Sequence, residues 1–118
     1  MGWDRLRKAL EPVADKLILP EPAENSRPSW FGFLISVRPE SGLDRNAVTR
    51  YIESQNVQTR LLFSGNLIKH PCFDQIRGTD AYRVVGDLKT TDFIMNNTFW
   101  VGVYPGMTDE MIDHMAKV

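Results

Sequence analysis

The chain has 118 residues, 42% of them hydrophobic, and a formal net charge of −1, so it has enough sequence for one core but lacks the basic surplus of nucleic-acid binders. No apolar run is long enough to span a bilayer, residues 1–20 do not resemble a secretory signal, and one cysteine excludes an intramolecular disulfide and a cysteine-rich metal site. We therefore expect a globular, cytoplasmic protein that binds neither nucleic acid nor membrane.

The first 28 residues predict a helix, a short extended segment and a loop. Apolar residues recur every three or four positions over residues 3–13, as in an amphipathic helix. Pro12 disrupts this pattern, so the helix either ends near Leu10 or restarts with the proline in its first turn. Residues 17–19 follow as an extended piece, and the prolines of residues 20–28 indicate a loop.

Residues 29–37 form the strongest predicted strand. Alternation places one apolar set on one face and a second set on the other: Phe31, Phe33, Ile35 and Val37, then Trp30 and Leu34. Because a strand that is apolar on both sides is covered on both sides, we expect both faces to be buried.

The remaining elements complete a mixed pattern. Asp44 is the expected N-cap of a helix that ends before Asn56. The next predicted elements are strands over residues 57–63 and 82–85, a helix over 88–96, a strand over 99–104 and a final helix capped by Thr108, with 64–82 mostly irregular. These elements predict an α+β fold, with a small, mostly antiparallel sheet of three to four strands and helices packed on one face.

Few residues suggest catalysis. Cys72 and His70 could form a nucleophile and base, and His70 and His114 could bind a metal, but no third orienting group or metal-binding spacing accompanies them. A packed thiol beside a surface imidazole is the simpler interpretation.

The end of the 57–63 strand is a better candidate. Arg60 can present a fixed fork to a phosphate, while Ser64 and Asn66 add short polar groups around the flexible Gly65. The alternative is an ordinary strand end with a solvated arginine.

Three segments resemble a known family. These are Val57–Leu67 with the following His70–Phe73, Tyr82–Leu88 and Phe99–Thr108, and the similarity extends from Trp3 to Met115. They resemble the DegT-type sugar aminotransferases and dehydratases, which are fold type I pyridoxal-phosphate enzymes, and within that family the branch that removes the C3 hydroxyl of CDP-4-keto-6-deoxyhexoses in lipopolysaccharide biosynthesis.

This resemblance implies that the chain is a fragment. Residues 1–19 would be a connecting helix and short strand, and residues 20–118 a C-terminal small domain. A missing N-terminal large domain would hold pyridoxal or pyridoxamine phosphate, so we expect the fragment to be inactive and to bind neither cofactor nor metal. The parent enzyme would be a homodimer.

The resemblance also implies a branch and a binding site. Family aminotransferases carry two histidines where this chain has Leu62 and Ile68, which favours the dehydrase branch. In that branch pyridoxamine phosphate is the working cofactor, and an iron–sulfur cluster can be bound upstream. The nucleotide-sugar substrate would be contacted by four residues: Arg60, Ser64, Asn66 and Arg83.

Two alternatives remain open, a small domain of a sugar aminotransferase and a stand-alone α+β binding module. A domain separated from a larger enzyme should expose an apolar patch where its partner sat. Trp3, Trp30 and Leu34 are the residues expected in that patch.

Overall fold

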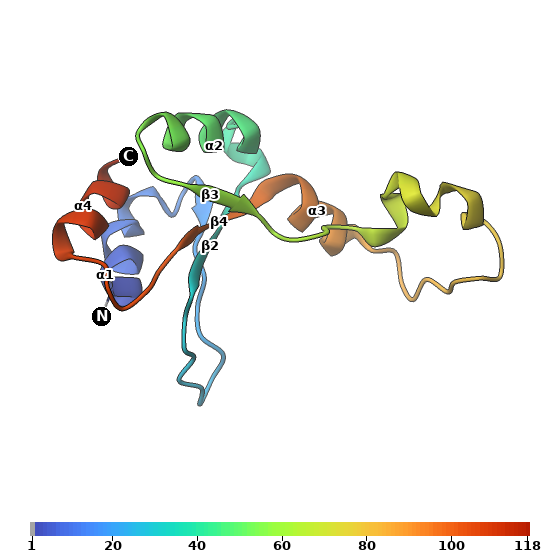
Figure 1. Cartoon of the computed structure of the whole chain (residues 1–118), viewed down its shortest axis with the longest axis horizontal. Helices are drawn as coiled ribbons and strands as arrows, with labels where there is room; N and C mark the ends of the chain where they lie inside the picture. Colours follow the sequence, from blue (N-terminus) through green and yellow to red (C-terminus); the bar gives the residue numbers. More distant parts are fainter. Residues whose placement is uncertain (1) are drawn as a thin grey trace.

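Alternating apolar residues build a four-stranded antiparallel sheet in the computed structural model, which describes residues 2–118 (Figure 1). The strands are β1 (Leu17–Ile18), β2 (Gly32–Val37), β3 (Thr59–Leu61) and β4 (Thr98–Gly102). Their order in the sheet is β1-β2-β4-β3, so β2 and β4 are central. These two strands pair from Gly32 opposite Gly102 to Ser36 opposite Thr98.

Two of the four helices of residues 2–118 begin at the N-caps that the sequence predicts. The four are α1 (Gly2–Ala9), α2 (Arg45–Ser54), α3 (Lys89–Asn97) and α4 (Asp109–Lys117). The Asp44 carboxylate accepts the Ala47 amide at 2.8 Å, and the Thr108 hydroxyl accepts the Met111 amide at 3.3 Å, so both predicted N-caps are confirmed. Pro12 lies in a separate 3₁₀ turn, Glu11–Val13, after α1 has ended.

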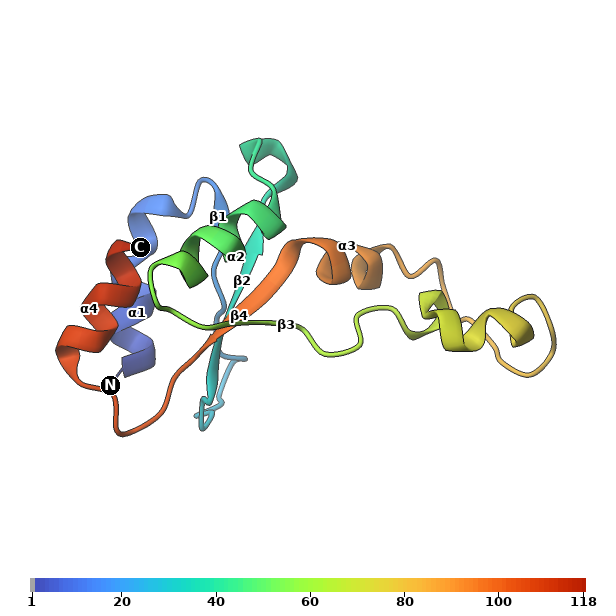
Figure 2. The same ribbon diagram turned by 45° about the horizontal axis from the view of Figure 1, so that its top comes forward.

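The core lies between one face of the sheet and helices α1, α2 and α4 (Figure 2). Phe33 and Phe99 are almost completely buried at its centre. Arg5 of α1 donates two hydrogen bonds to the Asp113 carboxylate of α4, at 2.9 and 2.7 Å, which joins the two helices. The predicted α+β fold with helices on one face is confirmed. No helix of residues 2–118 has the length and apolar character needed to cross a membrane.

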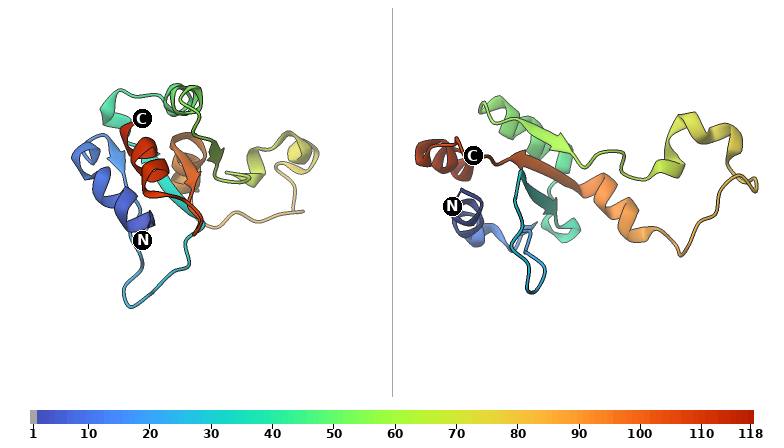
Figure 3. Two further views of the ribbon diagram at one scale, coloured as in Figure 1. Left: turned by 60° about the vertical axis from the view of Figure 1, so that its left-hand side comes forward. Right: turned by 60° about the horizontal axis from the view of Figure 1, so that its bottom comes forward.

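Residues 67–86 form an arm that extends away from the sheet in every view (Figures 1 and 3). Two 3₁₀ segments, Leu67–Lys69 and Pro71–Ile76, give it local structure. The arm raises the radius of gyration to 16.6 Å, whereas a compact domain of this length has about 13.5 Å. Because this segment leaves the sheet, the strand predicted over residues 82–85 finds no neighbour to pair with, and that prediction is wrong.

Two strand predictions need correction. The strand predicted over residues 57–63 is shortened to β3, since Phe63 adopts φ +44° and leaves the extended conformation. The expected face assignment also fails before Gly32: Trp30 stacks on Trp3 at the core side, whereas Phe31 meets Trp100 on the opposite face. The alternation that holds from Gly32 onward does not continue through the preceding two residues.

Candidate functional site

The candidate site begins on the face of the sheet opposite the helices, here called the open face. Side chains alternate along a strand, so Leu34 points away from the core that its neighbours Phe33 and Ile35 fill. The register places Trp100 opposite Leu34 on one side and opposite Arg60 on the other. The open face therefore presents an indole between an aliphatic side chain and a guanidinium.

One end of the open face is hollowed by a cavity of about 260 Å³ with a largely apolar lining. Phe31 meets the Trp100 ring edge-on, with centroids 5.4 Å apart, and Phe63 lies tilted against it at 6.5 Å. A Cβ on Gly32 would come within 2.7 Å of the same indole, so this glycine lets the ring lie on the strand backbone. The indole Nε1 is buried without a hydrogen-bond partner.

These side chains form an exposed apolar surface, here called the open-face patch, which consists of Phe31, Leu34, Leu62, Phe63 and Trp100. Phe31 is 66% exposed and Phe63 75%. The predicted patch exists, but its composition differs from expectation. Trp3 is 6% exposed and belongs to the core, where Trp30 stacks on it. Of the three expected residues, Trp30 and Leu34 line the cavity of the open face and Trp3 does not.

Arg60 lies on the edge strand β3, beside the indole of Trp100. It is exposed, and its guanidinium makes no hydrogen bond or ion pair within residues 2–118. A guanidinium carries five N–H donors in a planar fork that matches carboxylate and phosphate oxygens. The donors of Arg60 are thus available to an anionic ligand at the open face.

The chain then turns sharply through residues 62–66, here called the root of the arm. Phe63 and Gly65 both adopt positive φ, at +44° and +61°, on either side of the exposed Ser64. His70 Nε2 bonds the Ser64 carbonyl, which holds the turn closed and leaves the Ser64 hydroxyl exposed. The root therefore presents one short hydroxyl next to the open-face patch.

Asn66 has a different environment from the other predicted site residues. It is only 2% exposed, and its amide donates to Asp92 of α3 at 2.8 Å. Lys69 reaches the other oxygen of the same carboxylate, also at 2.8 Å. These two hydrogen bonds hold the pKa of Asp92 below its usual value, and the bond from Lys69 has the larger effect. The buried side chain of Asn66 therefore fastens the root to α3.

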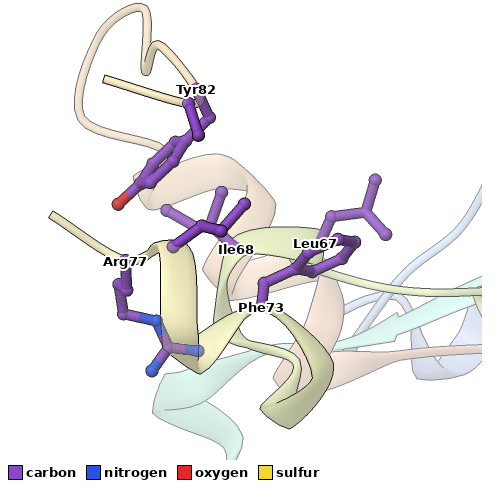
Figure 4. A pocket seen from close by; sticks show the side chains of 7 residues that line it. Leu67, Ile68, Phe73, Arg77 and Tyr82 are labelled. Atoms are coloured by element: carbon purple, nitrogen blue, oxygen red, sulfur yellow. The ribbon is translucent and has the colours of Figure 1, made fainter. Parts of the chain in front are cut away.

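The arm carries a second apolar cavity, of about 300 Å³ (Figure 4). Leu67, Ile68, Phe73 and Tyr82 line it, together with the stem of Arg77. Arg83 is exposed in the irregular segment between the 3₁₀ segments of the arm and α3, and neither Arg83 nor Arg60 lines this cavity or the one on the open face. The structure brings Arg60 and Ser64 to one end of the sheet, whereas Arg83 belongs to the arm.

The other reactive side chains have structural partners or lie alone. His70 bonds the Ser64 carbonyl rather than Cys72, and His114 Nε2 bonds the Gln55 carbonyl at 2.8 Å. Cys72 is a free, exposed thiol. Residues 2–118 contain no group of three acidic, histidine or cysteine side chains that could hold a metal ion.

The lysines bear on the cofactor implied by the resemblance. Pyridoxal phosphate is held through a lysine Schiff base inside a pocket. All five lysines of the chain are exposed: Lys8, Lys16, Lys69, Lys89 and Lys117. Two of them, Lys69 and Lys89, pair with aspartates. None of the five is buried, although Lys16 and Lys117 border a cavity of about 520 Å³ beside the core.

Comparison with known proteins gives this geometry a context. Residues 2–118 match the model of the DegT/DnrJ/EryC1/StrS aminotransferase family. The chain belongs to this family. Among family members it is 45% identical over 116 residues to dTDP-4-dehydro-2,6-dideoxy-D-glucose 3-dehydratase of Saccharopolyspora spinosa, and 46% identical over 116 residues to lipopolysaccharide biosynthesis protein RfbH of Salmonella typhimurium.

These alignments cover 98% of this chain but only 24% and 26% of the two relatives. The chain thus spans about a quarter of the length of the curated relatives it matches. The structure of E. coli GDP-4-keto-6-deoxy-D-mannose-3-dehydratase with bound hydrated PLP superposes with a TM-score of 0.72 at 23% identity, covering 98% of this chain and 30% of that one. This agreement confirms the expected α+β fold.

Sequence reasoning missed Phe31, Phe63 and Trp100 as the centre of the apolar surface, and Asp92 as the partner of the root. Trp100 could have been found, because alternation through Phe99 and Val101 places it on the opposite face. The pairing of Asn66 with Asp92 joins residues 26 positions apart, and no local pattern predicts it.

Proposed function

We propose that this chain is the C-terminal small domain of a pyridoxal- or pyridoxamine-phosphate-dependent dehydratase. The enzyme would remove the C3 hydroxyl of a CDP-4-keto-6-deoxyhexose in the biosynthesis of a deoxysugar of lipopolysaccharide. The observation that carries this proposal is the identity of 45–46% along almost the whole chain to a sugar 3-dehydratase and to RfbH.

The apolar surface supports a domain that acts as part of a larger protein. Phe31 and Phe63 are too exposed for an isolated domain, and a neighbouring unit that covers them would bury the whole open-face patch. We propose that this unit is a large domain that holds the cofactor, since none of the lysines of residues 2–118 is buried. Residues 1–19, with α1, would connect the two units, and residues 20–118 would form the small domain.

The contribution of this chain is to bind and orient the nucleotide sugar. Arg60 would bind a diphosphate oxygen, because its donors are free and a charge-assisted bidentate pair fixes direction as well as distance. Ser64 would reach the sugar from the root. Asn66 would contribute to the same edge mainly by holding the root in place, and Arg83 would approach the substrate from the arm.

Leu62 and Ile68, at the two positions where family aminotransferases carry histidines, support a dehydratase over an aminotransferase. Leu62 lines the hollow of the open face, and Ile68 lines the cavity of the arm. Neither side chain can accept or donate a proton, so this edge of the site would exclude water and leave proton transfer to groups outside the chain. An aminotransferase remains the second candidate, as named by the family.

Product analysis tests the proposal. The intact protein, supplied with pyridoxamine phosphate and 4-keto-6-deoxyhexoses linked to CDP, dTDP or GDP, should give a product that lacks the C3 oxygen and carries no new nitrogen, with CDP preferred. Mass spectrometry with a ¹⁵N-labelled amino donor distinguishes the two reactions. A labelled amino sugar that keeps its C3 hydroxyl would identify an aminotransferase, and no turnover of any sugar would favour a stand-alone binding module.

We also propose that a second copy of the protein is a partner, because the resemblance to this family implies a homodimer with shared sites. Sedimentation of the intact protein would report the oligomeric state. A monomer at concentrations that support full turnover would contradict the homodimer.

A further inference from the structure

The arm needs a device that fixes its direction, because it leaves the body of the domain through one sharp turn. Phe63 and Gly65 turn the chain with positive φ, and the arm then extends beyond the sheet (Figure 3). Its internal hydrogen bonds, such as Arg77 to the His70 carbonyl, stabilise the arm itself but not its angle to the sheet. The chain returns to α3 through Gly86 and Leu88, which also adopt positive φ, so the angle depends on these two connections and on contacts between the root or the arm and the body.

The polar contacts among them converge on α3, whereas the Phe63 ring of the root lies against Trp100 of β4. Asn66 donates from its amide side chain to one oxygen of Asp92, and Lys69 donates to the other. The Asn66 backbone amide also meets the Met95 sulfur at 3.4 Å. Within residues 2–118, the Lys69–Asp92 pair is the one ion pair that joins residues 67–86 to the body of the domain.

We propose that Asp92 is a positioning residue, and that Asn66, Lys69 and Asp92 form a latch that sets the direction of the arm. One carboxylate with two acceptor oxygens bridges the last buried residue before the arm and the first cation within it. The buried side-chain amide of Asn66 has no hydrogen-bond partner other than Asp92 within residues 2–118, so loss of Asp92 leaves it unsatisfied and favours release of the root. Met95 backs the same turn, since a Cβ on Gly65 would lie 2.5 Å from its side chain.

The latch follows from the contacts alone, whereas its effect on turnover rests on the proposed function. If Ser64 and Arg83 contact the nucleotide sugar, an arm that samples several directions binds that substrate less often in the productive geometry. Asp92 would then act on the reaction through the root and arm without touching the substrate.

Hydrogen exchange of the intact protein tests the latch. Asp92→Ala removes both acceptors from a half-exposed helical position where alanine favours the helix. Amides of residues 64–70 should exchange roughly tenfold faster, while β2 stays protected. The matched control is Asp87→Ala, which breaks the exposed pair with Lys89 at the start of the same helix and should leave residues 64–70 unchanged.

A charge swap provides a second test of the latch. Lys69→Asp combined with Asp92→Lys should restore most of the protection, because the Asn66 amide can turn its oxygen toward the new ammonium. Exchange at residues 64–70 that is unchanged in Asp92→Ala, or a swap that exchanges as fast as the single variants, would overturn the latch. Faster exchange with unchanged kcat/KM for the nucleotide sugar would support the latch and count against the proposed substrate role of the root.

Discussion

Replacing Arg60 by alanine separates a binding role from a structural one. Arg60 is exposed and has no partner within residues 2–118, so its removal should change the free energy of unfolding by no more than about 0.5 kcal/mol. A hydrogen bond from a charged donor to a diphosphate oxygen is worth about 1.5–3 kcal/mol. We therefore expect kcat/KM of the intact enzyme for its nucleotide sugar to fall by roughly 10- to 150-fold.

The assay pairs steady-state kinetics with thermal melting. Arg50→Ala is the matched control, since Arg50 is an exposed arginine of α2, away from the open face, and should leave kcat/KM and melting unchanged. Arg60→Lys keeps the charge but loses the fork, so it should recover only part of the activity. Equal kcat/KM for Arg60→Ala and wild type would remove Arg60 from the site, and a large loss of stability would show that its role is structural.

Three further predictions test the fold. Arg45 is 9% exposed and donates to the carbonyls of Thr98 at 3.0 Å and Met95 at 3.3 Å. Arg45→Met should therefore destabilise the protein by about 2 kcal/mol or more in urea melts. An unchanged midpoint would contradict this structural role. Gly65 has φ +61°, and a Cβ there would clash with Met95, so Gly65→Ala should lower the free energy of unfolding by more than about 2 kcal/mol. Gly42 has φ +73° but open space around it, so Gly42→Ala should lower it by only about 1 kcal/mol. Equal losses of stability would refute the clash with Met95. The hydrogen bond from Arg5 lowers the pKa of Asp113, so this carboxylate contributes stability above its ordinary pKa of 3.8 that is lost as the pH falls through the lowered value. Asp113→Asn should therefore weaken the acid dependence of unfolding below about pH 4 and leave its slope near neutral pH unchanged; a changed slope near neutral pH would argue against this assignment.

Most of the fold follows from local chemistry. The Asp44 and Thr108 caps, the proline break after α1 and the alternation of β2 and β4 each rest on residues close together in sequence. The predictions that failed depend on what lies beside a segment in space. Residues 82–85 have strand-like composition, but no neighbouring strand is within reach of the arm.

The candidate site was less predictable for the same reason. Arg60 and Ser64 could be selected because a strand ends between them, and the structure places both beside the open face. Asn66 has the same local character, yet it is buried because Asp92, on a later helix, supplies its partner. Likewise the exposure of Trp3 could not be judged from the strand pattern, since its burial depends on stacking with Trp30.

A structure of the intact protein with a CDP-linked 4-keto-6-deoxyhexose bound tests the central claim most directly, namely that the open face and root of this domain line the nucleotide-sugar site. We predict the Arg60 guanidinium within hydrogen-bond distance of the diphosphate, Ser64 directed at the sugar and the open-face patch covered by the cofactor-binding unit. A nucleotide sugar bound away from Arg60 and the root, with Phe31 and Phe63 still exposed to solvent, would contradict the account.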